Sequence, residues 1–171
     1  RDRQCDVAQI ETVTLLTHAE AVRFCDNPSP DTDLRAKFSL QHVVALALLT
    51  GTVDMDDFSE ARWVDSMVTN WRRRVSVQED AQLTAAFPQH YGASLLAILR
   101  GGERVRVDCV DSLGDPDKPL SHDQIVAKAR RLQQWSGRGE PAIRELELAI
   151  LDLPRMNDLG GLMQTFEGNA R

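Results

Sequence analysis

Two alternating runs of residues, joined by a pair of glycines, most restrict how this chain can fold. They span residues 94–99 and residues 104–111, with Gly101 and Gly102 between them. Apolar or thiol side chains occupy every other position of the second run: Val105, Val107 and Cys109. Side chains alternate between the two faces of a strand, and glycines permit a tight turn between strands. The pattern therefore predicts a half-exposed β-hairpin.

Two further stretches have the composition of strands. Residues 9–18 are rich in Thr, Val and Ile, and residues 73–80 alternate. Helices are expected after residue 18, from residues 31–33 to Thr50, within residues 54–71, from Ser121 to Trp135, and from Pro141 to Leu151. About four strands with five or six helices predict an α+β fold, an antiparallel sheet packed with helices.

Three of the expected helices carry specific signals. The helix expected to end at Thr50 can be capped by Asp31, Thr32 or Asp33, and Gly51 stops it. We expect its apolar part to pack between the sheet and neighbouring helices. Ser121 and Pro141 suit the starts of the other two. Apolar residues recur in these two at helical spacing and are expected to face inward: Ile125, Ala129, Leu132, Ile143, Leu146 and Ile150.

Composition limits the class of protein. With 171 residues, 42% of them hydrophobic, we expect a single domain over residues 1–171, with its core in residues 10–132 and C-terminal helices in residues 139–171. A net charge of −6 disfavours nucleic acid as a partner. The longest apolar run, residues 43–49, is too short for a membrane span, and no signal peptide is visible. We therefore expect a cytoplasmic protein without a membrane partner.

Other polar motifs have ordinary explanations. Cys5, Cys25 and Cys109 are widely spaced and form no metal-ligand pattern, so we expect free thiols and no metal site. The acidic residues 54–57 lack the spacing of a calcium loop and suit the first turn of a short helix. The basic residues 71–75 and 128–131 are expected to be a strand lead-in and a solvated helix face. His18, His90 and His122 are isolated, so we expect surface or capping roles for them.

Lys37, Ser39 and His42 stand just before an almost wholly apolar helical stretch. A helix N-terminus carries partial positive charge, so a lysine in its first turn is unfavourable by about 0.3–1 kcal/mol unless an anion offsets it. A bound carboxylate would provide the offset. Ser39 could donate a further hydrogen bond, and His42 lies on the same side of the helix and could move a proton near neutral pH.

A structural explanation of the same three residues is also open. Lys37 could extend into solvent or pair with Asp31 or Asp33. Ser39 could be a secondary helix cap, and His42 could bind a carbonyl at the edge of the core.

Five blocks stand in this order along the chain: AKFSLQHVVALALLTGTV, DDFSE, VSVQED, AAFPQHYGASLLAILRGGERV and GDPDKPLSHDQIVAKAR. Together they resemble the C-terminal domain of the MmgE/PrpD superfamily. That superfamily includes 2-methylcitrate dehydratase, cis-aconitate decarboxylase and iminodisuccinate epimerase. The resemblance covers residues 10–132, and its most specific parts are AKFSL and the GDPDKPLS loop with Lys128 downstream.

The resemblance implies a two-domain enzyme, in which a small α+β domain like this one closes against an all-helical N-terminal domain that this chain lacks. It implies a small di- or tricarboxylate substrate, no metal or organic cofactor, and a homodimer. The shared chemistry is proton abstraction next to a carboxylate, which needs a base and cations that hold the carboxylates. From this chain the resemblance implies substrate binding by Lys37 and Ser39 and a catalytic role for His42.

Two positions depart from the family pattern. Phe38 stands where the decarboxylase carries a histidine, which argues against decarboxylation of cis-aconitate. His42 stands where relatives commonly carry tyrosine. We therefore expect part of a lyase or isomerase of the 2-methylcitrate dehydratase type, inactive as this chain alone. The alternative is a non-catalytic interaction or scaffolding domain that keeps the fold without the chemistry.

Overall fold

The computed structural model of the chain describes residues 6–167, so Cys5 lies outside the described residues. The chain divides into two compact units, Arg1–Lys118 and Pro119–Arg171. Compact units need not fold independently, so a single domain over residues 1–171 stays a prediction. Among the helices of residues 6–167, none combines the length and the apolar character that crossing a bilayer requires.

The first unit is built on a four-stranded sheet, as the sequence predicts. Its strands are β1 (Ile10–Thr17), β2 (Val75–Glu79), β3 (Ala93–Leu99) and β4 (Arg104–Cys109). They lie in the order β2-β1-β3-β4. The predicted hairpin is confirmed, because β3 and β4 pair antiparallel in a register that places Ala97 opposite Val105.

The sheet is mixed, so the expectation of a purely antiparallel sheet is wrong. Strand β1 pairs antiparallel with β3 but parallel with β2, with Val13 opposite Val75. Parallel neighbours need a long crossover connection, because the chain must return to the same end of the sheet. The segment from residue 18 to residue 74 provides that crossover and contains several helices.

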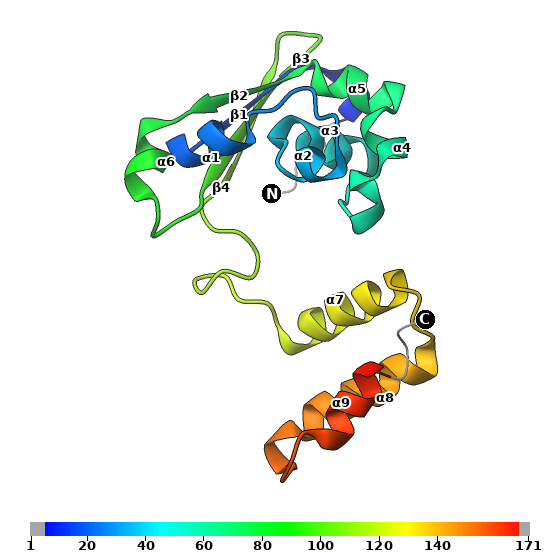
Figure 1. Cartoon of the computed structure of the whole chain (residues 1–171). Helices are drawn as coiled ribbons and strands as arrows, with labels where there is room; N and C mark the ends of the chain where they lie inside the picture. The colour runs from blue at the N-terminus through cyan, green and yellow to red at the C-terminus, as the bar shows by residue number, and fades with distance from the viewer. Residues whose placement is uncertain (1–5, 168–171) are drawn as a thin grey trace. The chain divides into compact units, whose positions relative to one another are not determined.

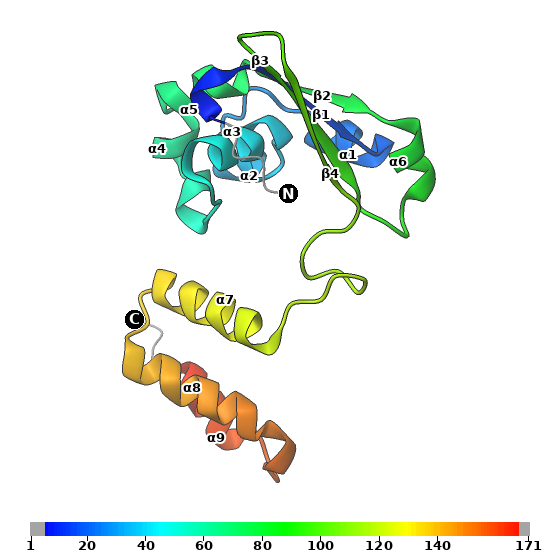
Figure 2. The same cartoon turned by 180° about the vertical axis from the view of Figure 1, so that it is seen from behind.

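Helices of the first unit cover one face of this sheet. They are η1 (Val7–Gln9), α1 (Ala19–Cys25), α2 (Asp33–Lys37), α3 (Leu40–Thr50), η2 (Met55–Phe58), α4 (Glu60–Trp63), α5 (Ser66–Arg72) and α6 (Ala81–Ala86). In Figure 1 helices α1 to α3 stand in front of the strands, and in the reverse view of Figure 2 strands β3 and β4 pass in front of these helices. The unit is therefore an α+β structure with two layers.

Helix α3 links the two parts of the core, as expected for the apolar stretch. Val44 packs with Val13 and Val75 of the sheet. Leu46, on the same helix, is fully buried against Val68 of α5. A helix that is apolar on most of its surface is stable in water only when neighbours cover it on several sides. Its packing between the sheet and α5 meets that requirement.

The second unit consists of helices in its described part. These are α7 (His122–Trp135), α8 (Glu140–Asp152), η3 (Leu153–Arg155) and α9 (Gly160–Glu167). The predicted starts are confirmed: the Ser121 hydroxyl accepts from the Gln124 amide, and Pro141 lies in the first turn of α8.

The expected inward face of this unit is only partly buried. Ile143 and Leu146 are buried, but Ile125 is 53% exposed and Ile150 is 46% exposed. Ala129 and Leu132 are exposed as well. Ile125, Ala129 and Ile150 nevertheless line the space between α7 and α8, so they face inward as predicted without being buried. Helical spacing shows that a stripe is apolar, but burial also requires a neighbour that covers it.

Candidate functional site

The junction between α2 and α3 contains the three residues singled out above. The sequence predicts one helix up to Thr50, but α2 ends at Lys37 and α3 begins at Leu40. Ser39 has an extended backbone, with φ −121° and ψ 104°, and its Oγ accepts a hydrogen bond from the His42 amide at 3.1 Å. A serine in this role satisfies one of the free amides that begin a helix. The prediction of a continuous helix is therefore wrong, because the cap at Ser39 starts a new one.

Ser39 also ties α3 to the preceding loop. Its hydroxyl donates to the Asn27 carbonyl at 2.6 Å, and its side chain is almost fully buried. Gln41 reinforces this link, because its Oε1 accepts from the Asn27 amide at 3.2 Å and its Nε2 donates to Asp26 at 2.5 Å. The hydroxyl of Ser39 is thus engaged on both sides within the fold, and a role in substrate binding stays a prediction.

His42 lies inside the unit, with 0% of its surface exposed. Its Nε2 is 2.8 Å from the Asp57 carbonyl oxygen, which can only accept, so Nε2 carries the hydrogen. Its Nδ1 then faces the Arg72 guanidinium at 3.5 Å as an acceptor. Burial lowers the pKa of His42, the hydrogen bond to Asp57 opposes this effect, and the charge of Arg72 adds to it. The ring is therefore neutral near pH 7 and joins α3 to η2.

Arg72 belongs to the basic residues 71–75, for which the sequence predicts a strand lead-in, but it is the last residue of α5 and is buried. It is 6% exposed, and its Nη1 donates to the Trp63 carbonyl at 2.8 Å while Nη2 donates to Thr69 Oγ1 at 3.0 Å. Burial is the main cause of its lowered pKa. The helical spacing of Arg72 from buried Val68 could have shown that it faces inward.

The acidic residues after α3 have the structural role expected for them. Asp57 Oδ2 accepts from the Asp54 amide at 2.8 Å, and its Oδ1 pairs with Arg62 Nε at 3.1 Å. This arrangement closes the first turn of η2. The Asp57 carbonyl is at the same time the acceptor for His42, so Asp57 links η2 to α3 through its backbone and to α4 through its side chain.

Lys37 is the last residue of α2 and is exposed. Neither proposed carboxylate is its partner, because Asp31 pairs with Arg35 at 3.2 Å and Asp33 accepts from Trp63 Nε1 at 3.0 Å. No ion pair joins Lys37 to any residue of the described part of the chain. Its ammonium group is therefore a cation without a counter-charge in residues 6–167.

The position of Lys37 differs from the expected first turn of a helix. At the end of α2 the lysine lies at the negative end of a helix dipole, which is favourable. It also lies two residues before Ser39, where α3 presents its positive end. The two dipoles act in opposite directions on the ammonium group.

Exposed apolar side chains flank Lys37. Leu34, one turn earlier in α2, is 65% exposed, and Phe38, directly after α2, is 54% exposed. Exposed apolar residues are ordinary singly, so these two show only that the surroundings of the ammonium group are apolar. The junction thus offers an unpaired ammonium group and an apolar surround on an otherwise well-anchored segment.

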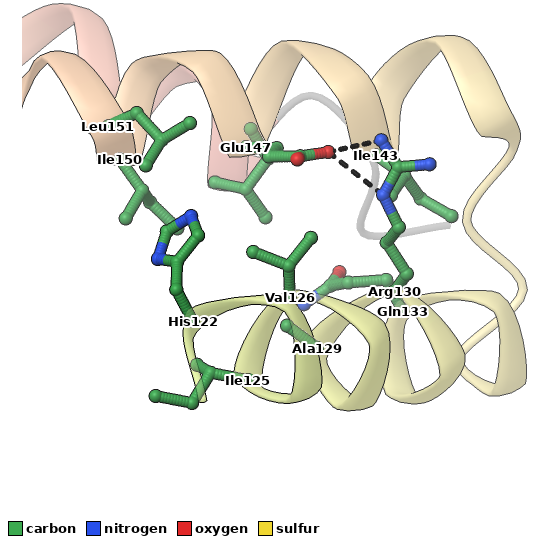
Figure 3. Close-up of a pocket in the computed structure, with 11 residues that line it drawn as sticks. His122, Ile125, Val126, Ala129, Arg130, Gln133, Ile143, Glu147, Ile150 and Leu151 are labelled. Atoms are coloured by element: carbon green, nitrogen blue, oxygen red, sulfur yellow. Dashed lines mark hydrogen bonds and ion pairs between the residues drawn. The ribbon is translucent and has the colours of Figure 1, made fainter. Parts of the chain in front are cut away.

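The second unit has a pocket of different character, between α7 and α8. Its volume is about 170 Å³, and most of its lining is apolar, as Figure 3 shows. The cation on its wall, Arg130, donates from Nε to Glu147 at 2.9 Å and pairs with Glu140 at 3.2 Å. A pocket whose cation is already neutralised has little to offer a substrate with two or three carboxylates.

The remaining sequence-predicted roles are simple to place. His18 caps α1 by accepting from the Ala21 amide at 3.2 Å, which confirms the capping role. His90 contacts Asp111, 21 residues away, a pairing that no local pattern could have shown. Cys25 and Cys109 are free thiols, and burial raises the pKa of Cys25.

A comparison with protein families finds one description that matches this chain, the MmgE/PrpD C-terminal domain, over residues 1–151. The match includes the whole first unit and continues through α7 into α8. It also contains every block on which the resemblance in the sequence rests. A search of curated proteins finds no match.

Proposed function

Because the chain belongs to the MmgE/PrpD family, of which it contains the C-terminal domain, we propose that it closes over the substrate of a cofactor-free lyase or isomerase. The proposed substrate is a small di- or tricarboxylate. The proposed reaction begins with removal of a proton next to a carboxylate, as in a dehydratase of the 2-methylcitrate type. An all-helical N-terminal domain of the same protein is the proposed partner, in a cytoplasmic homodimer.

The unpaired ammonium group of Lys37 is the observation that best supports this proposal. It is exposed, it has no carboxylate partner in residues 6–167, and Leu34 and Phe38 flank it. An ammonium group in water attracts a carboxylate weakly, but the attraction grows as a closing domain excludes water. Leu34 and Phe38 would exclude water on this side of the substrate. Lys37 would then hold one carboxylate and stabilise the charge that proton removal creates.

Ser39 and His42 support Lys37 from within the fold in this proposal. Ser39 starts α3 two residues after the lysine and anchors the junction to Asn27. His42 holds η2 in place, and both η2 and α4 pack against α2. Both side chains are buried, so direct contact with the substrate, as the family resemblance implies for them, would require residues 54–57 or the Asn27 loop to move.

Proton removal needs a base that the junction does not offer. His42 is buried and its hydrogen-bearing nitrogen faces a carbonyl. Asp31, Asp33 and Asp57 are engaged with Arg35, Trp63 and Arg62. We therefore assign the base and the acid to the helical N-terminal domain, which leaves this chain one carboxylate clamp of a split site.

The experiment that tests the proposal compares two proteins. The 171-residue chain and a protein that also contains the helical domain are each incubated with 2-methylcitrate, citrate and cis-aconitate, and the products are followed by NMR. We expect turnover of at least one compound by the two-domain protein only. Turnover by the 171-residue chain would contradict the split site, and no turnover by either protein would contradict this substrate class.

A non-catalytic interaction domain is the second candidate. One observation favours it: the side chains of Ser39 and His42 are already used to hold the fold together. The exposed Phe38 and Leu34 would then form part of a protein interface, and Lys37 its polar rim. This candidate predicts that the helical domain binds the 171-residue chain in a separate binding assay, while the two-domain protein turns over none of the three compounds.

A further inference from the structure

A histidine and two aspartates from three segments meet at one end of the sheet, away from the α2–α3 junction. His90 lies between α6 and β3, Asp111 follows β4, and Asp117 lies in the loop after it. One ligating atom of each lies within 4.8 Å of the other two. His90 Nδ1 is 2.7 Å from Asp111 Oδ1. We propose that these three side chains together bind one divalent metal ion, and that this ion is Zn²⁺.

The donor set suits this ion. Zn²⁺ binds imidazole nitrogen and carboxylate oxygen at about 2.0–2.2 Å, and three protein ligands leave room for water. Two ligands on a Zn²⁺ ion therefore lie about 3–4 Å apart, so small side-chain rotations bring the three groups to it. The two carboxylates balance the charge of the ion when His90 is neutral. A mixed nitrogen and oxygen set disfavours Mg²⁺, which prefers oxygen ligands and retains several waters.

The scaffold holds His90 and Asp111 close together before any ion binds. Gly92 stands two residues after His90, and a Cβ at this position would lie 3.3 Å from the Val110 carbonyl and 2.9 Å from Leu83. The contact with Leu83 involves the end of a flexible side chain, so a side chain at residue 92 would mainly crowd the Val110 carbonyl, which shows how closely the two segments approach. The Asp111 side chain is 16% exposed, and its backbone carbonyl accepts from the Cys109 thiol at 3.3 Å. The first two ligands thus come from packed, well-defined backbone.

The loop that carries Asp117 is also constrained. The Gly114 amide donates to the Lys118 carbonyl at 2.8 Å, and the Lys118 amide donates to the Asp115 carbonyl at 2.9 Å. Lys118 Nζ reaches the Asp111 carbonyl at 3.5 Å, which brings the end of the loop back to the sheet. A metal ion at this point would fasten the loop to the end of the hairpin.

Protons would compete with the metal for this site. The hydrogen bond to Asp111 is the main cause of a raised pKa for His90, and the charges of Asp111 and Asp117 act in the same direction. The same negative charge that favours a proton favours a divalent cation. Binding of Zn²⁺ at His90 Nδ1 therefore displaces the proton that this nitrogen otherwise shares with Asp111.

The test is a titration of the full 171-residue chain with ZnCl₂ after treatment with EDTA, followed by calorimetry. We expect one Zn²⁺ per chain, and binding at least tenfold weaker in His90→Ala and in Asp117→Asn. Even residues that only hydrogen-bond to metal ligands change the affinity by about 10–100-fold when they are replaced. His122→Ala is the matched control, because His122 lies at the exposed start of α7 outside the cluster, and it should bind Zn²⁺ as the wild type does.

Melting curves with and without Zn²⁺ provide a second readout. Zn²⁺ should raise the melting temperature of the wild type and of His122→Ala, but not of His90→Ala. Asp117→Asn removes one exposed carboxyl charge, so it should fold in EDTA like the wild type. Absence of saturable binding, or equal binding by the wild type and the cluster variants, would overturn the proposal and leave His90 and Asp111 as a simple ion pair.

Discussion

Replacing Lys37 by methionine is the sharpest test of the proposed carboxylate clamp. Methionine keeps most of the aliphatic stem and removes the charge, and Lys37 is exposed with no ion pair in residues 6–167. No described contact of the fold is lost with the ammonium group. The effect on activity therefore reports on the substrate rather than on the structure.

The expected loss of activity follows from the strength of one charged hydrogen bond. Such a bond contributes about 1.5–3 kcal/mol, more than a neutral one. Because about 1.4 kcal/mol corresponds to tenfold, kcat/KM should fall about 10- to 150-fold in Lys37→Met. If Lys37 also stabilises charge in the transition state, kcat should fall together with kcat/KM.

The free energy of unfolding should change little in the same variant. Lys37 lies at the favourable end of α2 and close to the unfavourable end of α3, each of which contributes about 0.3–1 kcal/mol at most. Their opposition leaves a net effect within about 0.5 kcal/mol, which corresponds to about 1–2 °C in Tm for a chain of this size. The first-turn position expected from the sequence would instead have predicted a gain in stability.

The assay measures kcat/KM and Tm of the two-domain protein, with Arg35→Met as the matched control. Arg35 lies on the same short helix and is also exposed, but its charge is paired with Asp31. Loss of that pair should cost about 0.3–0.5 kcal/mol of stability and leave kcat/KM unchanged. An unchanged kcat/KM in Lys37→Met, or an equal loss in both variants, would refute the clamp.

Three other outcomes follow from the same contacts. Ser39→Ala should lower the free energy of unfolding by about 1–3 kcal/mol, because a buried cap and the bond to Asn27 are lost. Ser59→Ala removes one exposed bond to Asp56 and should lower it less. Equal losses of the two variants in urea unfolding would contradict this assignment. Burial lowers the pKa of His42, so the folded chain binds fewer protons at acidic pH than the unfolded chain does. Stability should therefore fall as the pH drops below about 6.5. His42→Gln should flatten this dependence in melting curves recorded across that pH range. Trp63→Phe removes the bond to Asp33 that anchors α2, so the free energy of unfolding should fall by about 0.5–1.5 kcal/mol. Because this variant keeps the charge of Lys37, its kcat/KM should fall less than that of Lys37→Met. A larger fall in kcat/KM would show that α2 is held differently.

Local features of this protein could be predicted from its sequence. The β3–β4 hairpin follows from alternation around two glycines, and the start of α7 follows from Ser121. Each depends on residues within a few positions of one another, so periodicity and capping chemistry suffice. The family could also be recognised, since its blocks keep their order along the chain.

The candidate site was only partly predictable for the same reason. Lys37, Ser39 and His42 drew attention as polar residues beside an apolar stretch, but their roles depend on distant partners. Ser39 binds Asn27, and His42 binds Asp57 and faces Arg72. These contacts join segments 12 to 30 residues apart, and no local pattern encodes them.

The sequence by itself determined the four strands and most of the helices, though not α6, because side-chain periodicity and caps act within a single turn or hairpin. Only the tertiary structure decided that β2 lies parallel beside β1, that the helix expected before Thr50 breaks at Ser39, and that Ile125 remains exposed. Each of these depends on which distant segment supplies a hydrogen-bond partner or an apolar cover. Pairing and burial are properties of the assembled chain, so they follow from the contacts that the fold creates.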